Sequence, residues 1–406
     1  MIYRLFIGFY YAAIKFASLF NLKAKKWVEG RKNVFFELES ANLKKKKTLW
    51  FHAASYGEFE QGRPLMEAIR EKYPDYSILL TFFSPSGYEA FKDYKGADFV
   101  CYLPYDFKKN VIRFLEVVQP ANVFFIRYEF WLNYLSVLKK EKVKVYLISA
   151  VFRKNQLFFK WYGKSYRNAL NSFENIFVQN NYSAKLLEDI GYKNVIVSGD
   201  TRMDRVIEVA KSAKSFPLIE KFIQNKQVII AGSTWEKEDE IIAEYLNSTE
   251  KGVKIIVAPH EIREQKIEKL ISSINKKAIR YSNADELNVL DADVLIIDSI
   301  GILSSVYRYG TIAFVGGGFT DGIHNILEPA VYGMPIIFGP NYQKFIEASD
   351  LLFLGSAFCI ENYNSFKLIT NELLDEKEKL ASLSTISSDY VYRSAGATGK
   401  IVKMVL

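Results

Sequence analysis

The sequence predicts an α/β protein built from two doubly wound domains, each with its own parallel sheet. Three observations predict this class. Short, almost wholly apolar runs recur along the chain, as expected for strands buried on both faces, and segments of helical pattern fill the gaps between them. The series is interrupted once, by a polar, Lys-rich connection at 203–226, and 406 residues are too many for one ordinary core.

The first series of strands precedes this connection. Amphipathic helical segments separate its strands, for example at 59–72 and 129–142. Regular alternation of strand and helix is typical of a doubly wound sheet. The expected strands are "TLWFHA" (48–53), "YSILLTFF" (76–83), "DFVCYL" (98–103), "NVFFIR" (122–127), "KVYLIS" (144–149), "NIFVQ" (175–179) and "NVIVSG" (194–199).

The second series follows the connection and has the same pattern. Its expected strands are "QVIIAGS" (227–233), "VKIIVAP" (253–259), "DVLIID" (293–298), "TIAFVGG" (311–317), "PIIFG" (335–339) and "AFCI" (357–360). The predicted domains are 33–210 and 211–406, after a separate N-terminal segment, 1–32. The last helix is expected either to stay with the second domain or to pack back on the first. Two such domains in tandem are expected to face a cleft, where ligands usually bind.

The N-terminal segment has two interpretations. The stretch "LFIGFYYAAIKFASLF" (5–20) is apolar but is interrupted by Lys15, and it is shorter than the roughly 20 apolar residues of a spanning helix. No small-residue cleavage site follows it, which argues against a signal peptide. Basic residues come next, at Lys23, Lys25, Lys26, Arg31 and Lys32. The pattern favours a helix on the anionic surface of a membrane over a helix packed on its own core.

Composition and net charge limit the classes of binding partner that the protein is expected to have. The formal charge of +8 is compatible with nucleic acid, anionic lipid or a phosphorylated substrate. No zinc-ligand spacing or RNA-binding signature accompanies it, so nucleic acid is not expected. Cys101 and Cys359 lie in strand-like stretches and are predicted to be buried thiols. The basic run 44–47 is expected to be a solvated loop or a second membrane-facing patch.

All three histidines of the chain lie at the carboxyl end of a predicted strand or in the loop after one. These are His52, His260 and His324. Ligands of open α/β sheets bind at that edge, so the placement favours a shared cleft over three unrelated structural histidines. No H-x-x-H or H-E-x-x-H spacing occurs, and no metal site is expected.

The glycine-rich stretch "VGGGFTDGIHNILEPAVYGMPIIFGP" (315–340) carries the strongest binding signal. A strand ends in three glycines, which let backbone N–H groups approach a ligand. A helix is expected to start near Asn325, where it would favour an anion such as a phosphate. Glu328 can accept hydrogen bonds from ribose hydroxyls. This combination is typical of nucleotide-sugar binding; the simpler interpretation is a glycine-rich turn before a capped helix.

The stretch "HAASYGE" (52–58) leaves the role of one carboxylate open. Ser55 and Glu58 have the spacing of a helix capping box. Glu58 also follows the first predicted strand, where a carboxylate would face the cleft. It cannot point to the cap and into the cleft in one rotamer. The local pattern alone favours the cap, but with the rest of the chain considered we expect the cleft.

Seven segments together resemble the 3-deoxy-D-manno-oct-2-ulosonic acid (Kdo) transferases of lipopolysaccharide synthesis, over nearly the whole chain. The segments are "FHAASYGE" (51–58), "RYEFWLN" (127–133), "LISAVFRKNQ" (147–156), "SGDTRMDRV" (198–206), "AGSTWEKEDE" (231–240), "APHEI" (258–262) and the glycine-rich stretch. The resemblance implies the GT-B fold and inverting, metal-independent transfer of Kdo from CMP-Kdo to a lipid A precursor. It implies no cofactor, and a place at the cytoplasmic face of the inner membrane.

The resemblance also implies roles for individual residues. Glu58 matches the general base of the family, Glu129 a carboxylate that supports the transition state, and Arg202 a position that is usually Lys with a similar role. The implied CMP contacts are Pro259, His260, Arg263, Ile300, Gly301, Ile302, Gly317, Gly318, Asn325, Ile326, Leu327 and Glu328.

Three departures from the family pattern bear on the site. "APHEI" replaces the commoner A-P-R-H-P-E-R, so His260 stands where an Arg is expected, and Arg263 is the candidate to compensate. "RYEFW" replaces E-T-E-L-W, so Arg127 stands in place of one carboxylate of a pair. "DSIGIL" (298–303) lacks the acidic residue commonly found after its glycine.

Two other functions fit parts of the sequence. One is a different enzyme of the same fold, a UDP-sugar transferase or a nucleotide-sugar epimerase. The other is a non-enzymatic protein that binds the membrane surface. Glu58 together with the glycine-rich stretch favours an enzyme over the latter.

Overall fold

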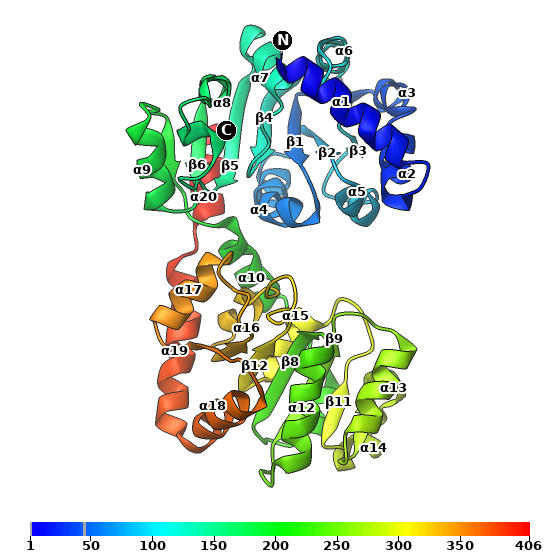
Figure 1. The fold of residues 1–406 in the computed structure, drawn as a ribbon, viewed down its shortest axis with the longest axis vertical. Coiled ribbons are helices and arrows are strands. Elements are labelled where there is room, and N and C mark those ends of the chain that lie inside the picture. The colour runs from blue at the N-terminus through cyan, green and yellow to red at the C-terminus, as the bar shows by residue number, and fades with distance from the viewer. Residues whose placement is uncertain (1, 44–45) are drawn as a thin grey trace. The chain divides into compact units, whose positions relative to one another are not determined.

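The computed structural model describes residues 2–43 and 46–406 and divides the chain into two compact units (Figure 1). The first unit comprises Met1–Asp204 together with Ala395–Leu406, and the second comprises Arg205–Ser394. Each unit has its own seven-stranded sheet, in which all neighbouring strands are parallel. The basic run 44–47 falls partly outside the described residues, at Lys44 and Lys45.

The first sheet has the strand order β3-β2-β1-β4-β5-β6-β7. This order reverses between β1 and β4, which is the switch point of a doubly wound fold. Every residue of β1 and β2 is buried because helices cover both faces of the sheet. The strands are β1 (Thr48–Ala53), β2 (Ser77–Phe82), β3 (Phe99–Tyr102), β4 (Pro120–Ile126), β5 (Lys144–Ala150), β6 (Asn175–Val178) and β7 (Val195–Val197). The helices that follow β1 are α4 (Tyr56–Lys72), α5 (Pro85–Phe91), α6 (Lys108–Val118), α7 (Leu132–Lys140), η2 (Leu157–Phe159), α8 (Lys164–Leu170), α9 (Asn181–Asp189) and α10 (Thr201–Lys211).

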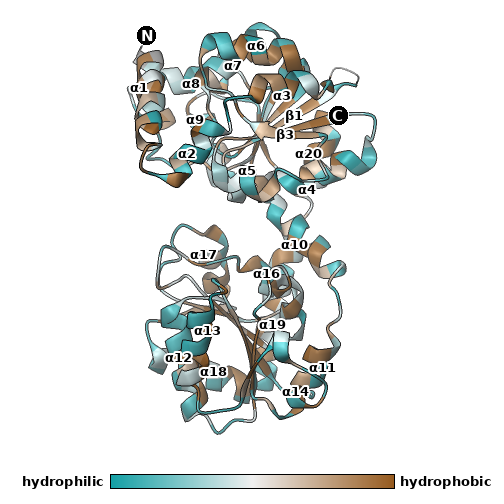
Figure 2. Ribbon diagram, turned by 90° about the vertical axis from the view of Figure 1, so that its right-hand side faces the viewer, coloured by the Kyte–Doolittle hydropathy of each residue, from teal (hydrophilic) through white to brown (hydrophobic). Residues whose placement is uncertain are grey.

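The second sheet has the equivalent order β10-β11-β9-β8-β12-β13-β14, with its switch point between β8 and β12. Figure 2 shows its strands coloured as hydrophobic. The strands are β8 (Val228–Thr234), β9 (Lys254–Pro259), β10 (Ala278–Arg280), β11 (Val294–Ile296), β12 (Ile312–Val315), β13 (Ile336–Phe338) and β14 (Ala357–Cys359). The helices are α11 (Pro217–Ile223), α12 (Glu236–Ser248), α13 (Glu264–Ser273), η3 (Tyr281–Asn283), α14 (Asn288–Asp291), α15 (Leu303–Val306), η4 (Tyr307–Tyr309), α16 (Leu327–Val331), α17 (Ile346–Phe353), α18 (Tyr363–Asp375) and α19 (Lys377–Arg393).

The last helix, α20 (Ala397–Val405), belongs to the first unit although it follows the whole second unit in the chain. Its apolar face, with Ile401 and Val402, joins the core beside β1. The Asp204 carboxylate fixes its start by accepting the backbone N–H groups of Gly396 (2.6 Å) and Thr398 (2.7 Å). Hydrophobic burial and a side-chain cap therefore hold this crossover in place.

The N-terminal helices α1 (Ile2–Ala17), α2 (Leu22–Glu29) and α3 (Val34–Ser40) also belong to the first unit. One face of α1 is packed on this unit: Ile7 and Tyr11 are buried with Trp27, and the Tyr3 hydroxyl donates to the Asp106 carboxylate (2.5 Å). The opposite face exposes large apolar side chains, among them Phe9 at 82%. Within the described residues no single helix is long and apolar enough to cross a membrane; only the bent pair of α1 and α2 reaches that length.

The prediction that Arg31 belongs to an exposed basic segment is wrong. Its side chain is 6% exposed, and its guanidinium donates to the carbonyl oxygens of Leu103, Trp27 and Phe83 at 2.7–2.9 Å. It also lies 4.0 Å from the centre of the Trp27 ring. Arg31 is thus a structural cation, buried with each guanidinium nitrogen donating to a carbonyl oxygen and with an aromatic face beside it.

Candidate functional site

A chain of buried polar groups starts in β1 and ends at a carboxylate. Trp50 and His52 lie on the same face of β1, two residues apart, and Thr81 of β2 lies directly across from His52. The Trp50 indole donates to Thr81 Oγ1 (2.8 Å), and this oxygen lies 2.9 Å from His52 Nδ1. His52 Nε2 lies 3.0 Å from Oε2 of Glu129, in the loop after β4. His52 is completely buried.

Glu129 is held from two sides. Its Oε2 also accepts the indole N–H of Trp131 (2.6 Å), and its residue is 9% exposed. With a proton on Nε2 the imidazole donates to Glu129, and the Thr81 hydroxyl then donates to Nδ1; the Trp131 indole nitrogen lies 3.1 Å from the same Nε2. Every donor in this series of side chains then has an acceptor, and the carboxylate is fixed in one orientation. We call Trp50, Thr81, His52, Glu129 and Trp131 the His52 relay.

Glu58 lies in the first turn of α4 and is partly buried. Ser55 is the N-cap residue, but its side chain makes no capping bond to the backbone of the helix. Instead its hydroxyl donates directly to Glu58 Oε2. The capping box is therefore not formed: Glu58 bonds the side chain of Ser55 and not the backbone of the cap. A serine hydroxyl holds the carboxylate at the end of β1.

Strained backbone marks the same edge of the first sheet. Arg127 directly follows β4 with φ of 68°, and Ser149 interrupts the β5 ladder with φ of 53°. Each left-handed residue of this kind costs about 1–3 kcal/mol. The Ser149 hydroxyl lies 3.0 Å from that of Thr201, which donates to the Gln61 carbonyl (2.5 Å). This contact connects the β5 bulge to the start of α10.

Arg202 is adjacent to this bulge but its charge is already engaged. Its backbone N–H donates to Asp200 Oδ1 (2.9 Å), and its guanidinium donates twice to Oδ2, from Nε (2.9 Å) and Nη2 (2.6 Å). Asp200 thus orients Arg202 and partly neutralises it.

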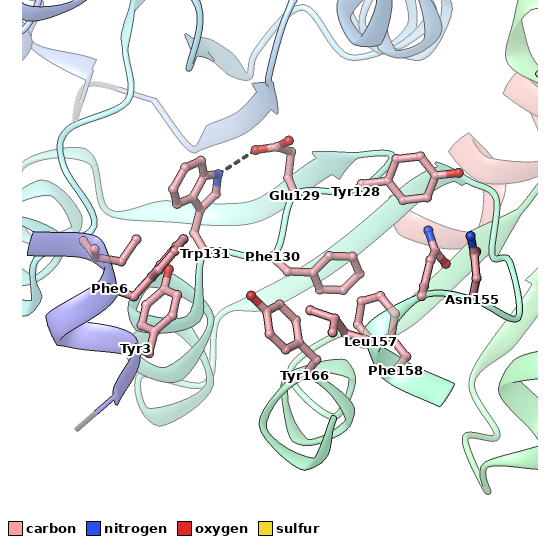
Figure 3. Close-up of a pocket in the computed structure, with 12 residues that line it drawn as sticks. Tyr3, Phe6, Tyr128, Glu129, Phe130, Trp131, Asn155, Leu157, Phe158 and Tyr166 are labelled. Atoms are coloured by element: carbon pink, nitrogen blue, oxygen red, sulfur yellow. Dashed lines mark hydrogen bonds between the residues drawn. The ribbon is translucent and has the colours of Figure 1, made fainter. Parts of the chain in front are cut away.

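An aromatic pocket of about 450 Å³ lies between α1, the segment 128–131 and the loop before α8 (Figure 3). Glu129 and Trp131 of the His52 relay line it, and the phenol of Tyr128 and the amide of Asn155 lie together at one end (Figure 3). Its lining residues are Tyr3, Phe6, Ile7, Tyr128, Glu129, Phe130, Trp131, Asn155, Gln156, Leu157, Phe158 and Tyr166. The pocket joins an apolar wall to a fixed carboxylate.

In the second unit, three rings are stacked where β8 and β9 end. The ring centres of Trp235 and His260 are 4.6 Å apart, and those of His260 and His324 are 4.4 Å apart. The Trp235 indole donates to His324 Nε2 (3.1 Å). Burial, and then the neighbouring His260, lowers the pKa of His324 to about 4. The structure thus brings His260 and His324 together, whereas His52 belongs to the first unit.

The glycine-rich stretch is shaped mainly by close backbone packing. A Cβ on Gly316 would lie 2.1 Å from the Ser233 carbonyl oxygen, and one on Gly318 would lie 2.4 Å from the Gly339 nitrogen. Gly317 has φ of 88°, which favours glycine. These glycines let the loop pass between the ends of β8 and β13.

The helix expected to start near Asn325 starts two residues later and is short. α16 comprises only Leu327–Val331, with Ile326 at its N-cap position. Asn325 Oδ1 accepts the Leu327 N–H (3.1 Å), and its amide donates to Glu328 Oε1 (3.0 Å). A five-residue helix has a weak dipole, so attraction of an anion here would depend on individual N–H groups.

The other expected CMP contacts lie at neighbouring strand ends of the second unit. Pro259 ends β9, and Arg263, the candidate to compensate for the missing arginine, donates to Glu261 (3.0 Å). Ile300 is 91% exposed, and Gly301 has φ of 87° just before Ile302, the N-cap position of α15.

The described residues contain no group of three His, Cys, Asp or Glu side chains placed to hold a metal ion. Of the two cysteines, Cys101 is buried as predicted. The prediction of a buried thiol is wrong for Cys359, which is partly exposed at the sheet-edge strand β14.

The sequence placed His52 at a strand end, with the other histidines at a shared cleft, but gave it no role of its own in the site. The available signal was the alternation of Trp50 and His52 in "TLWFHA". That alternation puts two polar rings on one face of an otherwise apolar strand.

Comparison with known proteins agrees with this architecture. A family model described as "3-Deoxy-D-manno-octulosonic-acid transferase (kdotransferase)" matches residues 30–205. The 3-deoxy-D-manno-octulosonic acid transferase of Aquifex aeolicus is 31% identical, over 85% of this chain and 91% of its own. That of Haemophilus influenzae is 26% identical, over 96% of this chain and 94% of its own.

Solved structures share the fold at low sequence identity. A UDP-GlcNAc 2-epimerase from Neisseria meningitidis has a TM-score of 0.62 at 18% identity, over 88% of this chain and 99% of its own. MurG from Acinetobacter baumannii has a TM-score of 0.56 at 11% identity, over 89% and 99%. The predicted α/β architecture of GT-B type, with two doubly wound sheets, is thus confirmed. The chain belongs to the 3-deoxy-D-manno-octulosonic acid (Kdo) transferase family of glycosyltransferases.

Proposed function

We propose that this protein transfers Kdo from CMP-Kdo to a lipid A precursor in lipopolysaccharide synthesis, with inversion and without a metal ion. One observation carries the proposal: similarity to named Kdo transferases extends over both units, at 31% identity over 85% of the chain for the Aquifex aeolicus protein. The polar groups at the carboxyl edges of both sheets support it.

Glu58 is the proposed general base. An acceptor hydroxyl attacks the anomeric carbon of Kdo, its proton goes to the Glu58 carboxylate, and the bond from that carbon to the CMP oxygen breaks. Attack opposite to the leaving CMP inverts the configuration. The Ser55 hydroxyl, which donates to Glu58 Oε2, keeps the carboxylate at the end of β1.

Glu129 is the proposed electrostatic partner of the transition state. Positive charge develops on the sugar ring as the bond to CMP breaks, and a fixed carboxylate stabilises that charge without having to reorganise. The Trp131 indole N–H, which donates to Oε2, and the His52 Nε2, which lies 3.0 Å from it, supply the fixation. His52 is thus a positioning residue.

Side chains and backbone N–H groups are proposed to stabilise the charge that develops on the leaving CMP. The candidates are Arg202, positioned by Asp200, and the second-unit groups around His260, Arg263 and the Asn325–Glu328 turn. His324 stays neutral near pH 7 because its pKa is lowered to about 4, so it accepts the Trp235 N–H and supports the ring stack.

The acceptor is proposed to be reached at the cytoplasmic face of the inner membrane. The exposed apolar face of α1 and the neighbouring lysines support contact with an anionic bilayer surface. The aromatic pocket lies beside α1, so an acceptor held in the bilayer would be presented to Glu129.

A panel of nucleotides tests the donor. CMP should raise the melting temperature of the protein, because a ligand that binds only the folded state stabilises it. UDP should leave it unchanged. Stabilisation by UDP but not CMP would instead favour a UDP-sugar enzyme of the same fold, such as the epimerases that share the architecture.

A further inference from the structure

Arg127 stands in a backbone position that its residue type does not favour. It directly follows β4, has φ of 68°, and donates its N–H to the Ile148 carbonyl of β5 (2.9 Å). A glycine would make the same turn and the same backbone bond without strain. Strain at such a turn is characteristic of functional sites, so the side chain rather than the turn calls for an explanation.

The Arg127 guanidinium has unused donors. Its Nε is buried and has no hydrogen-bond partner, and no ion pair of Arg127 is found in the described part of the chain. The guanidinium carbon lies 5.6 Å from the centre of the Tyr128 ring, so the cation extends along an aromatic face. A buried donor without a partner is costly, which makes this group ready to bind an acceptor.

The segments that follow neighbouring strands add further donors, and some of these are also buried without a hydrogen-bond partner. Gln179 follows β6, the strand next to β5, and its backbone N–H donates to the Ala150 carbonyl oxygen. Its side-chain Nε2 is buried without a partner, and so is the Tyr128 hydroxyl. Arg153 follows β5. Burial raises the pKa of Tyr128; the positive charges of Arg127 and Arg153 oppose this rise, and the negative charge of Glu58 adds to it. All three charges therefore lie near the phenol.

We propose that Arg127, Tyr128, Arg153 and Gln179 form a subsite for an oxyanion carried by a substrate sugar. We call it the Arg127 subsite, and it rests on the proposed function. A guanidinium presents paired N–H donors that match the oxygens of a phosphate or carboxylate, which a lysine ammonium does not. The oxyanion has two possible sources, a phosphate of the acceptor and the carboxylate of Kdo.

The position of the subsite fits a substrate group. Tyr128 lines the end of the aromatic pocket that also contains Glu129 (Figure 3). An oxyanion bound there would hold the sugar between Glu58 and Glu129, two carboxylates that would otherwise repel a negatively charged substrate. The Arg127 subsite therefore supplies both attraction and orientation.

The variant Arg127→Gly separates the two roles of this residue, because glycine keeps the turn and removes the guanidinium. Lys142→Gly is the matched control: Lys142 also has positive φ (55°) and is exposed in the turn before β5. Both variants lose one cation and relieve one strained residue, so both should melt at or above the wild-type temperature. Steady-state kinetics are measured with CMP-Kdo and with intact or phosphatase-treated lipid A precursor.

For Arg127→Gly we expect a KM increase of about 10- to 100-fold for the substrate that carries the anion. If the anion is the acceptor phosphate, the increase occurs only with the intact acceptor, and the treated acceptor no longer distinguishes the variant from wild type. If it is the Kdo carboxylate, the KM for CMP-Kdo rises with either acceptor. Arg127→Lys should be intermediate.

Wild-type kinetics of Arg127→Gly with both substrates would overturn the Arg127 subsite. A melting temperature well below that of Lys142→Gly would also overturn it, since Arg127 would then be a structural residue. Absence of transfer by the wild-type enzyme is a different outcome, which would contradict the proposed function itself.

Discussion

His52 Nε2 lies 3.0 Å from Glu129 Oε2, and both residues are buried at the carboxyl edge of the first sheet. The contact joins a strand residue, fixed on its other side by Thr81, to a carboxylate in the loop after β4. It turns a flexible glutamate into a fixed one.

Replacing His52 tests this contact. His52→Ala removes a buried ring and leaves Glu129 with one donor fewer, so we expect a loss of about 2–4 kcal/mol in unfolding free energy and a sharp fall in kcat. His52→Gln retains an N–H donor and should recover part of both. Urea unfolding measures the free energy of unfolding, and transfer kinetics measure kcat. A purely structural histidine would lose stability in His52→Ala but keep kcat per folded molecule.

Replacing Glu58 tests the general base. Glu58→Ala should abolish transfer and leave the affinity for CMP, measured by calorimetry, nearly unchanged, because the base binds the acceptor proton and not the nucleotide. Ser55→Ala is the matched control; it removes only the hydroxyl that orients the carboxylate and should reduce kcat partly. Equal losses of folding stability and activity in Glu58→Ala would instead indicate a structural role.

Replacing Glu328 tests the ribose contact. Glu328→Ala should weaken CMP binding about tenfold or more, as expected for the loss of a hydrogen bond to a charged group. Asn325→Ala removes the amide that donates to Glu328 and should have a smaller effect in the same direction. Calorimetry on both variants provides the comparison, and unchanged affinity in Glu328→Ala would rule out the assigned contact.

The stability of the protein should respond to His324 in mild acid. Its pKa is about 4 when folded, below the unfolded value of about 6.5, so the unfolded state takes up a proton first. The contribution of His324 to the free energy of unfolding is fully present above pH 6.5 and is lost as the pH falls from 6.5 towards 4. Burial raises the pKa of Asp239 to about 6, which acts in the opposite direction over much of this range.

Comparison with His324→Gln isolates the histidine from the other titrating groups. Between pH 7 and pH 4.5, the urea concentration at the unfolding midpoint should fall more for the wild type than for the variant. An equal fall in both proteins would show that His324 is not the group that resists protonation.

The exposed face of α1 should bind membranes. Phe9 of α1 and Phe20, in the turn that follows this helix, are 82% and 80% exposed, so changing both to Glu should leave the melting temperature unchanged. Binding to vesicles that contain anionic lipid should fall strongly, since burial of each aromatic ring in the interface is lost. Sedimentation with vesicles measures this. Undiminished binding would place the membrane contact elsewhere.

The sequence predicted the sheets well because buried parallel strands are continuous apolar runs. The run at 48–53 coincides with β1 (Thr48–Ala53), and the interruption at 203–226 begins next to the division at Asp204. The return of α20 to the first unit was left open, because an apolar helix face does not specify which sheet it covers.

Site geometry was less predictable, since it depends on contacts between segments distant in sequence. The His52 relay requires the register that puts Thr81 opposite His52, which neither strand specifies alone. The burial of Arg31 depends on carbonyls from two distant loops. For Glu58, the capping pattern identified the correct neighbour, Ser55, but not the side-chain bond that forms.

The most direct test of the proposed function is the mass of the product. The full chain is incubated with CMP-Kdo and a lipid A precursor, and the acceptor is examined by mass spectrometry beside a Glu58→Ala reaction. We predict that the wild-type protein adds Kdo to the acceptor and releases CMP, and that the variant adds none. An unmodified acceptor in the wild-type reaction, with CMP-Kdo intact, would contradict the proposal.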